Sequence, residues 1–190
     1  DEFGWMGRTA DVMRSKQAED MIINVGSTQS LAVKSAIHTP LVFDDPMRFQ
    51  RSYWMNQVDF SSSAEPSYKS ANHEFLKAVD VSAKSSARRI RKAWSDYETN
   101  VDYGIVPMDL PKVASCIDAG LETQLYHLSF RNNAFDTHVQ QPNLHRRLLS
   151  YASDAIFGFV NDLKRLGHAD RVVVMVYSEF GRRVPENANL

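Results

Sequence analysis

Several features that often identify a protein's function are missing from this sequence. Cys116 is the only cysteine, so no disulfide can form within the chain. No apolar run approaches the roughly 18 residues that a membrane helix needs, and no signal peptide is recognisable. With 22 basic and 23 acidic residues the formal net charge is −1, and no basic block is interleaved with aromatic residues. We therefore expect no membrane span in this segment and no nucleic-acid partner.

Common catalytic motifs are also missing. The chain has no glycine-rich phosphate loop, no Gly-x-Ser-x-Gly elbow and no His-Glu-x-x-His motif. It opens without a methionine and stops shortly after a strongly charged motif. We therefore expect residues 1–190 to be a single partial α/β domain, a fragment that has the remainder of its own chain as a partner.

Apolar periodicity predicts the secondary structure. Residues 71–99 carry apolar side chains three or four positions apart and form one long amphipathic helix, whose basic opposite face we expect to be solvated. A serine-rich connector, Ser61 to Ser70, precedes this helix. The other predicted elements are short helices at Trp5 to Lys16 and Leu110 to Ala119, and strands at Met21 to Val25, Ser30 to Val33 and Ala36 to Phe43.

Residues 122–183 read as a βαβ unit. Thr123 to Phe130 is predicted to be a strand, Pro142 to Leu166 a helix, and the apolar run from Arg171 to Tyr177 a strand buried on both faces. Strands joined by such a crossover are parallel. The predicted fold class is therefore α/β, with a mostly parallel sheet flanked by helices.

The same unit predicts a site. Parallel strands end at one edge of the sheet, where ligands bind. Asp136 and His138 follow the first strand and Glu179 follows the second, so a carboxylate, an imidazole and a second carboxylate are expected to meet there as metal ligands. In the alternative, Asp136 caps a turn, His138 makes a surface hydrogen bond, and Glu179 pairs with a neighbouring arginine.

Other polar residues belong to the same edge. Arg182 and Arg183 can bind an anion, and we expect Arg182 to face the site while the other arginine pairs with Glu186 or Asp136. The alternative is that both arginines are solvated. Ser178 and His145 are near enough in the predicted topology to support the ligands, although His145 is as readily exposed.

Several phrases of the sequence resemble one family. These are Phe135-Asp136-Thr137-His138, the leucine-rich helix after it, and Tyr-Ser-Glu-Phe-Gly-Arg-Arg-Val beginning at Tyr177; the opening Gly4-Trp5-Met6-Gly7-Arg8 adds to them. Together they resemble a bacterial family known only as domain of unknown function 1501. That family looks like a branch of the alkaline phosphatase and sulfatase superfamily, so the resemblance implies an incomplete alkaline-phosphatase-like domain.

The resemblance implies a function as well. It implies a metal-dependent hydrolase of sulfate or phosphate esters, with a divalent ion such as zinc, calcium or manganese held by Asp136, His138 and Glu179. The implied substrate is a small anionic ester or a sulfated or phosphorylated polymer, and the implied location is periplasmic or secreted. Glu179 and Phe180 stand where the superfamily usually has Asp and then His or Asn, and the segment carrying its nucleophile is not in this chain. The alternative is a non-catalytic secreted or envelope binding scaffold that has kept the fold with a degraded site.

Overall fold

The computed structural model describes residues 2–14, 16, 20–48, 71–130, 134–138 and 140–183, and gives only the backbone for residues 71–82. The predicted connector Ser61 to Ser70 lies outside the described residues. In chain order the elements are α1 (Trp5–Met13), β1 (Ile22–Val25), the 3-10 turn η1 (Leu31–Val33), β2 (Leu41–Phe43), α2 (Ala71–Asp96), α3 (Leu110–Asp118), β3 (Leu125–Leu128), α4 (Gln141–Arg165) and the 3-10 turn η4 (Ala169–Arg171).

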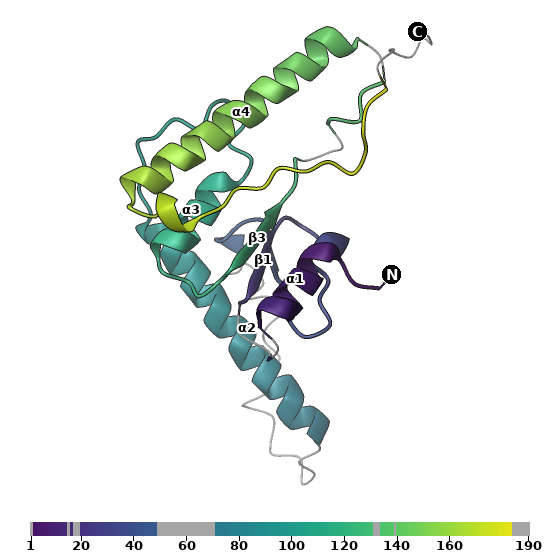
Figure 1. Cartoon of the computed structure of the whole chain (residues 1–190). Coiled ribbons are helices and arrows are strands. Elements are labelled where there is room, and N and C mark those ends of the chain that lie inside the picture. The colour runs from purple at the N-terminus through teal and green to yellow at the C-terminus, as the bar shows by residue number, and fades with distance from the viewer. Residues whose placement is uncertain are drawn as a thin grey trace.

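The sheet has three parallel strands in the order β2-β1-β3. β1 lies in the middle and pairs with β2 from Ile23 opposite Leu41. On its other side it pairs with β3, from Ile22 opposite Leu125 to Val25 opposite Leu128. A parallel sheet flanked by helices is the predicted α/β class, and Figure 1 shows the helices on both of its sides.

Alternate residues of β1 enter separate clusters. Ile23 and Val25 pack with residues of α2, α3 and α4, including Ile90, Val113 and Phe159. Ile22 points the other way and packs with Ala10 of α1, Met21 and Val33. Side chains alternate between the faces of a strand, and both faces of β1 are covered, so every one of its residues is buried.

Helix α4 approaches the core closely at one glycine. A Cβ at Gly158 would lie 2.5 Å from the carbonyl oxygen of Asp102 and 2.8 Å from the Cα of Tyr103. The side chains around this contact divide sharply, because Phe159 is 3% exposed and Phe157 is 68% exposed. Leu148 is buried, whereas Leu149 beside it is half exposed, so the inner face of this part of α4 passes through Leu148.

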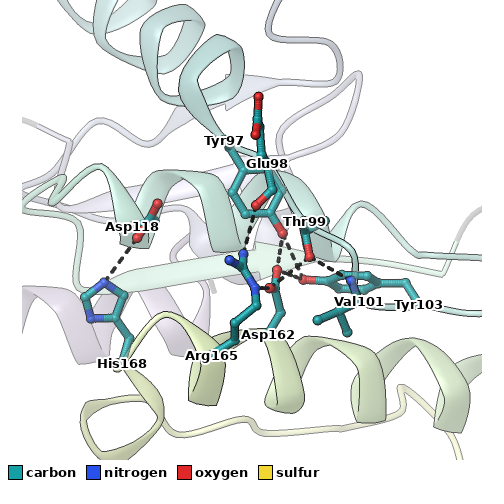
Figure 2. A network of polar contacts seen from close by, with 9 residues as sticks. All are labelled: Tyr97, Glu98, Thr99, Val101, Tyr103, Asp118, Asp162, Arg165 and His168. Carbon is teal, nitrogen blue, oxygen red and sulfur yellow. Dashed lines mark hydrogen bonds and ion pairs between the residues drawn. The ribbon is translucent and has the colours of Figure 1, made fainter.

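A buried aspartate fixes α4 to the loop that follows α2 (Figure 2). The Asp162 side chain is fully buried and accepts hydrogen bonds from Thr99 Oγ1 at 2.9 Å, Tyr103 Oη at 2.8 Å, Arg165 Nε at 2.7 Å and the Tyr97 hydroxyl. Burial opposes ionisation of Asp162, but these donors outweigh it and hold its pKa below the ordinary value. The cluster therefore has a structural role, and we call it the Asp162 lock because it holds α4 to the chain that follows α2.

The apolar run Val172 to Val176 differs from its prediction. It is extended at its start and runs beside β3 in the same direction, with Val172 against the core and Tyr177 against His127, as the yellow segment of Figure 1 shows. It is not one of the strands of the sheet, and Val173 is 93% exposed. The prediction of a doubly buried strand is wrong, because nothing among the described residues covers this segment as the helices cover β1.

Smaller differences have local causes. Ser30 to Val33 forms a 3-10 turn instead of a strand, because the Ser30 hydroxyl accepts the Ala32 N–H and caps the turn. Cys116 is buried, and burial raises the pKa of its thiol to about 12. None of the helices described is long and apolar enough to cross a membrane.

Candidate metal-binding site

The loop after β3 carries the first predicted ligands. Phe135 meets Phe130 edge-to-face at 5.0 Å between ring centroids, and meets His145 of α4 in the same way at 5.9 Å. These contacts hold the loop between the end of β3 and the first turns of α4. His145 is thus placed behind the loop, against Phe135, and its buried Nδ1 has no hydrogen-bond partner within the described residues.

Asp136 and His138 face each other. His138 Nε2 lies 3.2 Å from Asp136 Oδ1, and the side chains are 67% and 53% exposed, respectively. The carboxylate oxygen and the imidazole nitrogen are therefore in direct contact, as an ion pair when His138 is protonated, and the contact is open to solvent.

Glu179 does not complete a cluster. In the part of the chain that the structure describes, no group of three or more His, Cys, Asp or Glu side chains is arranged to hold a metal ion. Glu179 is exposed and lies within a small turn in which the Ser178 hydroxyl donates to the Phe180 carbonyl at 2.9 Å. Ser178 is thus engaged with its own turn rather than with Asp136 or His138.

The two arginines differ in their contacts. Arg182 donates from Nη1 to the Thr137 carbonyl at 2.9 Å and from Nη2 to Thr137 Oγ1 at 3.0 Å and to the Phe135 carbonyl. Arg182 therefore holds the loop, which is the role we expected of its neighbour. Arg183 is exposed, and Glu186, a predicted partner, lies outside the described residues.

Arg182 also brings the two predicted ligand segments together. Its acceptors lie on both sides of Asp136, and Glu179 precedes it by only a few positions on the same segment. The loop after β3 and the segment after Tyr177 therefore meet at one end of the sheet, on the upper right of Figure 1.

A second anchor of the segment after Val172, besides the contacts of Arg182, involves His127, for which no role was predicted. Asn24 Nδ2 donates to the Thr28 carbonyl at 3.0 Å, which orients the amide so that its Oδ1 faces His127 Nδ1, also at 3.0 Å. The proton of His127 is therefore assigned to Nδ1, and Nε2 accepts from the Tyr177 hydroxyl at 2.8 Å. Burial lowers the pKa of His127, which favours this neutral form.

The Tyr177 ring completes that anchor. It meets Trp5 of α1 edge-to-face at 5.3 Å. Burial, and then the nearby Glu179 charge, raise the pKa of Tyr177, so its hydroxyl stays protonated and can donate. No local pattern could have revealed this anchor, because Asn24 and His127 are 103 positions apart.

Comparison with known protein families gives one match. The model of the family described as "Protein of unknown function (DUF1501)" matches residues 2–190. No curated protein and no solved structure matches the chain.

Proposed function

The chain belongs to the DUF1501 family, and we propose that it is a metal-dependent hydrolase of sulfate or phosphate esters. In this proposal Asp136 and His138 are ligands of a divalent ion such as zinc, calcium or manganese. Glu179 is the third ligand in this proposal. It does not meet the other two in the described residues, but it lies on the segment that Arg182 ties to the same loop, and it would approach the ion as the ion binds. The likeness to alkaline phosphatases and sulfatases, and a periplasmic or secreted location, belong to the same proposal.

One observation carries the proposal, namely the separation between the two ligand atoms. His138 Nε2 and Asp136 Oδ1 are 3.2 Å apart. Zinc binds such atoms at roughly 2.0–2.2 Å in a tetrahedron, and two corners of that tetrahedron are about 3.3 Å apart. This spacing, which an ordinary His–Asp ion pair also has, is compatible with two corners of a zinc site and supports the proposal.

The surroundings suit an anionic substrate. A bound ion would act as a Lewis acid on an ester oxygen of sulfate or phosphate. Arg183 is exposed beside Arg182, whose guanidinium nitrogens Nη1 and Nη2 already donate to the loop, so Arg183 is the arginine we assign to the anion. Its planar fork matches two oxygens of such a group. Because the Asp136 and His138 side chains are more than half exposed, a small ester or a sulfated or phosphorylated polymer can reach them.

Metal titration tests the ligand assignment. We expect zinc to bind the purified chain stoichiometrically, and Asp136→Ala or His138→Ala to weaken binding by at least tenfold. The chain offers a matched control, because His168 Nε2 lies 3.6 Å from Asp118 Oδ1 on another part of the surface (Figure 2). Asp118→Ala should leave the zinc affinity unchanged.

Hydrolysis then separates an enzyme from a scaffold. The full-length protein, loaded with zinc, is assayed with p-nitrophenyl sulfate and p-nitrophenyl phosphate, and turnover should disappear in His138→Ala. Stoichiometric zinc with no turnover of either ester would favour the alternative, a binding scaffold with a degraded site. If neither Asp136→Ala nor His138→Ala changes the zinc affinity, the proposed site is wrong.

A further inference from the structure

Thr137, between the two proposed ligands, is held by side chains from two directions. Its hydroxyl donates to Gln141 Oε1 at 2.7 Å and accepts from Arg182 Nη2 at 3.0 Å. Its carbonyl accepts from Arg182 Nη1 at 2.9 Å and from the Gln141 amide. One partner comes from the first turn of α4 and the other from the segment after Tyr177, so the loop is fixed to two separate parts of the molecule.

The acceptors of Arg182 have a particular arrangement. Nη1 donates to the carbonyl of Thr137 and Nη2 to that of Phe135, the residues on either side of Asp136. The guanidinium is planar and rigid, so it fixes the two carbonyls relative to each other, which a lysine ammonium cannot do. The three Arg182 acceptors are uncharged groups, so these contacts position the loop and do not neutralise a carboxylate.

We propose that Arg182, Gln141 and Thr137 form a clamp that positions Asp136 and His138 for metal binding. As a claim about metal affinity it rests on the proposed function above. Both ligands lie on one exposed loop, and ordering such a loop when the ion binds would weaken binding. Contacts that orient metal ligands typically contribute 10–100-fold to metal affinity. The members of the clamp are therefore positioning residues, and Arg182 is one of them rather than an anion ligand.

The first experiment removes the Thr137 hydroxyl with little change in shape. Thr137→Val loses the contacts to Gln141 Oε1 and Arg182 Nη2, whereas Thr137→Ser keeps a hydroxyl and should retain both. We expect Thr137→Val to bind zinc 10–100-fold more weakly than the unaltered chain, and Thr137→Ser to bind within about twofold of it. Equal zinc affinities for Thr137→Val and the unaltered chain would overturn the clamp.

The second experiment tests the guanidinium. Arg182→Lys keeps the charge but not the fork, and we expect it to lose nearly as much zinc affinity as Arg182→Ala. Arg88→Ala changes an exposed arginine of α2 that has no part in the proposed site and serves as the control, with zinc affinity unchanged. Full retention of affinity in Arg182→Lys would show that charge alone matters and would overturn the clamp.

A readout without metal keeps the clamp and the metal site distinguishable. Hydrogen exchange of the amides of residues 134–138 is measured in the metal-free chain, and it should be at least tenfold faster in Thr137→Val and Arg182→Ala than in Thr137→Ser and Arg88→Ala. If the unaltered chain binds no zinc but exchange accelerates in this pattern, the metal proposal fails and the ordering role of the clamp stands. If zinc binds and neither exchange nor affinity changes in the variants, the clamp fails and the metal site stands.

Discussion

Two apolar segments of this chain have similar sequences and opposite environments. β1 and the residue before it read Met-Ile-Ile-Asn-Val, and every residue of β1 is buried between neighbouring strands and helices. The segment from Val172 reads Val-Val-Val-Met-Val, yet its side chains reach 93% exposure at Val173 and 73% at Val176. The backbone of β1 is paired on both sides, whereas the segment from Val172 runs beside β3 without a strand assignment.

The difference shows what an apolar run specifies. An apolar run shows that a segment is compatible with burial on both faces, and this holds for both segments. Burial itself also needs a strand alongside and a helix above, and only β1 has both. The segment from Val172 is held instead by side chains at particular points, Tyr177 on His127 and Arg182 on the loop after β3.

The largest expected effect comes from loosening the helix that covers β1. Asp162→Ala should lower the free energy of unfolding by about 3–5 kcal/mol, because it leaves buried donors, including the Tyr103 hydroxyl, without their acceptor. Asp154→Ala makes the same change at an exposed position of the same helix and should stay within about 0.5 kcal/mol of the unaltered chain. Urea unfolding of both variants measures the contrast, and equal losses would contradict the lock.

The same network sets a pH window. The pKa of Asp162 lies below 3.8 in the folded state. Its contribution to the free energy of unfolding is therefore complete above pH 3.8 and disappears as the pH falls further. Burial, and then the hydrogen bond to Asp162, raise the pKa of Tyr97 from 10.0 to about 12. The contribution of neutral Tyr97 to the free energy of unfolding is therefore complete below pH 10.0 and is lost as the pH rises through about 12. Asp162→Ala should therefore remove the acid limb of a plot of unfolding free energy against pH and only reduce the alkaline limb, because burial still raises the pKa of Tyr97.

Removing the α4 side chain that packs on β1 is expected to have a similar or slightly smaller effect on stability. Phe159 packs in the same cluster as Ile23 and Val25, and Phe159→Ala should cost about 3–5 kcal/mol. Phe157→Ala changes a residue two positions away that is 68% exposed and should cost under about 1 kcal/mol. Denaturant midpoints report both values. A loss at Phe157 as large as that at Phe159 would mean that the outer face of α4 is covered in solution.

The direct comparison uses the same substitution in each segment. Val25→Ala should cost about 1.5–3 kcal/mol, because it removes buried apolar surface beneath the helices. Val173→Ala removes the same atoms from a side chain that is 93% exposed, and it should change stability by no more than about 0.5 kcal/mol. Comparable losses in thermal unfolding would erase the contrast between the segments.

The smallest expected effect concerns the anchor of the exposed segment. Tyr177→Phe removes only the hydroxyl that donates to His127 Nε2 and should cost about 0.5–1.5 kcal/mol. The loss should shrink as the pH falls, because a protonated His127 no longer accepts this bond. Tyr151→Phe is the control, since Tyr151 makes no hydrogen bond among the described side chains. An identical effect of the two substitutions would show that the anchor contributes nothing.

Local patterns predicted the elements whose burial depends on near neighbours. The Met21 to Val25 run became β1, and the helices predicted at Leu110 and Pro142 begin within one residue of α3 and α4. The run at Arg171 to Tyr177 was mistaken for a strand because its environment is set by distant parts of the fold. The sequence contains the residues of a core strand there but not the layers that would enclose it.

The candidate site divides in the same way. Parallel topology predicted that the segments carrying Asp136 and Glu179 approach each other, and the contacts of Arg182 join them. That Arg182 would bind main-chain carbonyls was not predictable, because every residue offers the same carbonyl. Nor could the partner of His127 be identified, since it depends on a strand register set over a long stretch of chain.

That register has a consequence for how the molecule folds. β1 can pair with β2 as soon as residues 41–43 are available, but its other edge must wait for β3, whose His127 pairs with Asn24 across 103 positions of chain. Closing so long a loop is entropically costly and slows folding. Until β3 arrives, the newly synthesised chain carries an apolar strand with one open edge, the kind of edge that pairs with other chains. The yield of soluble protein should therefore depend on how quickly β3 reaches β1 during synthesis.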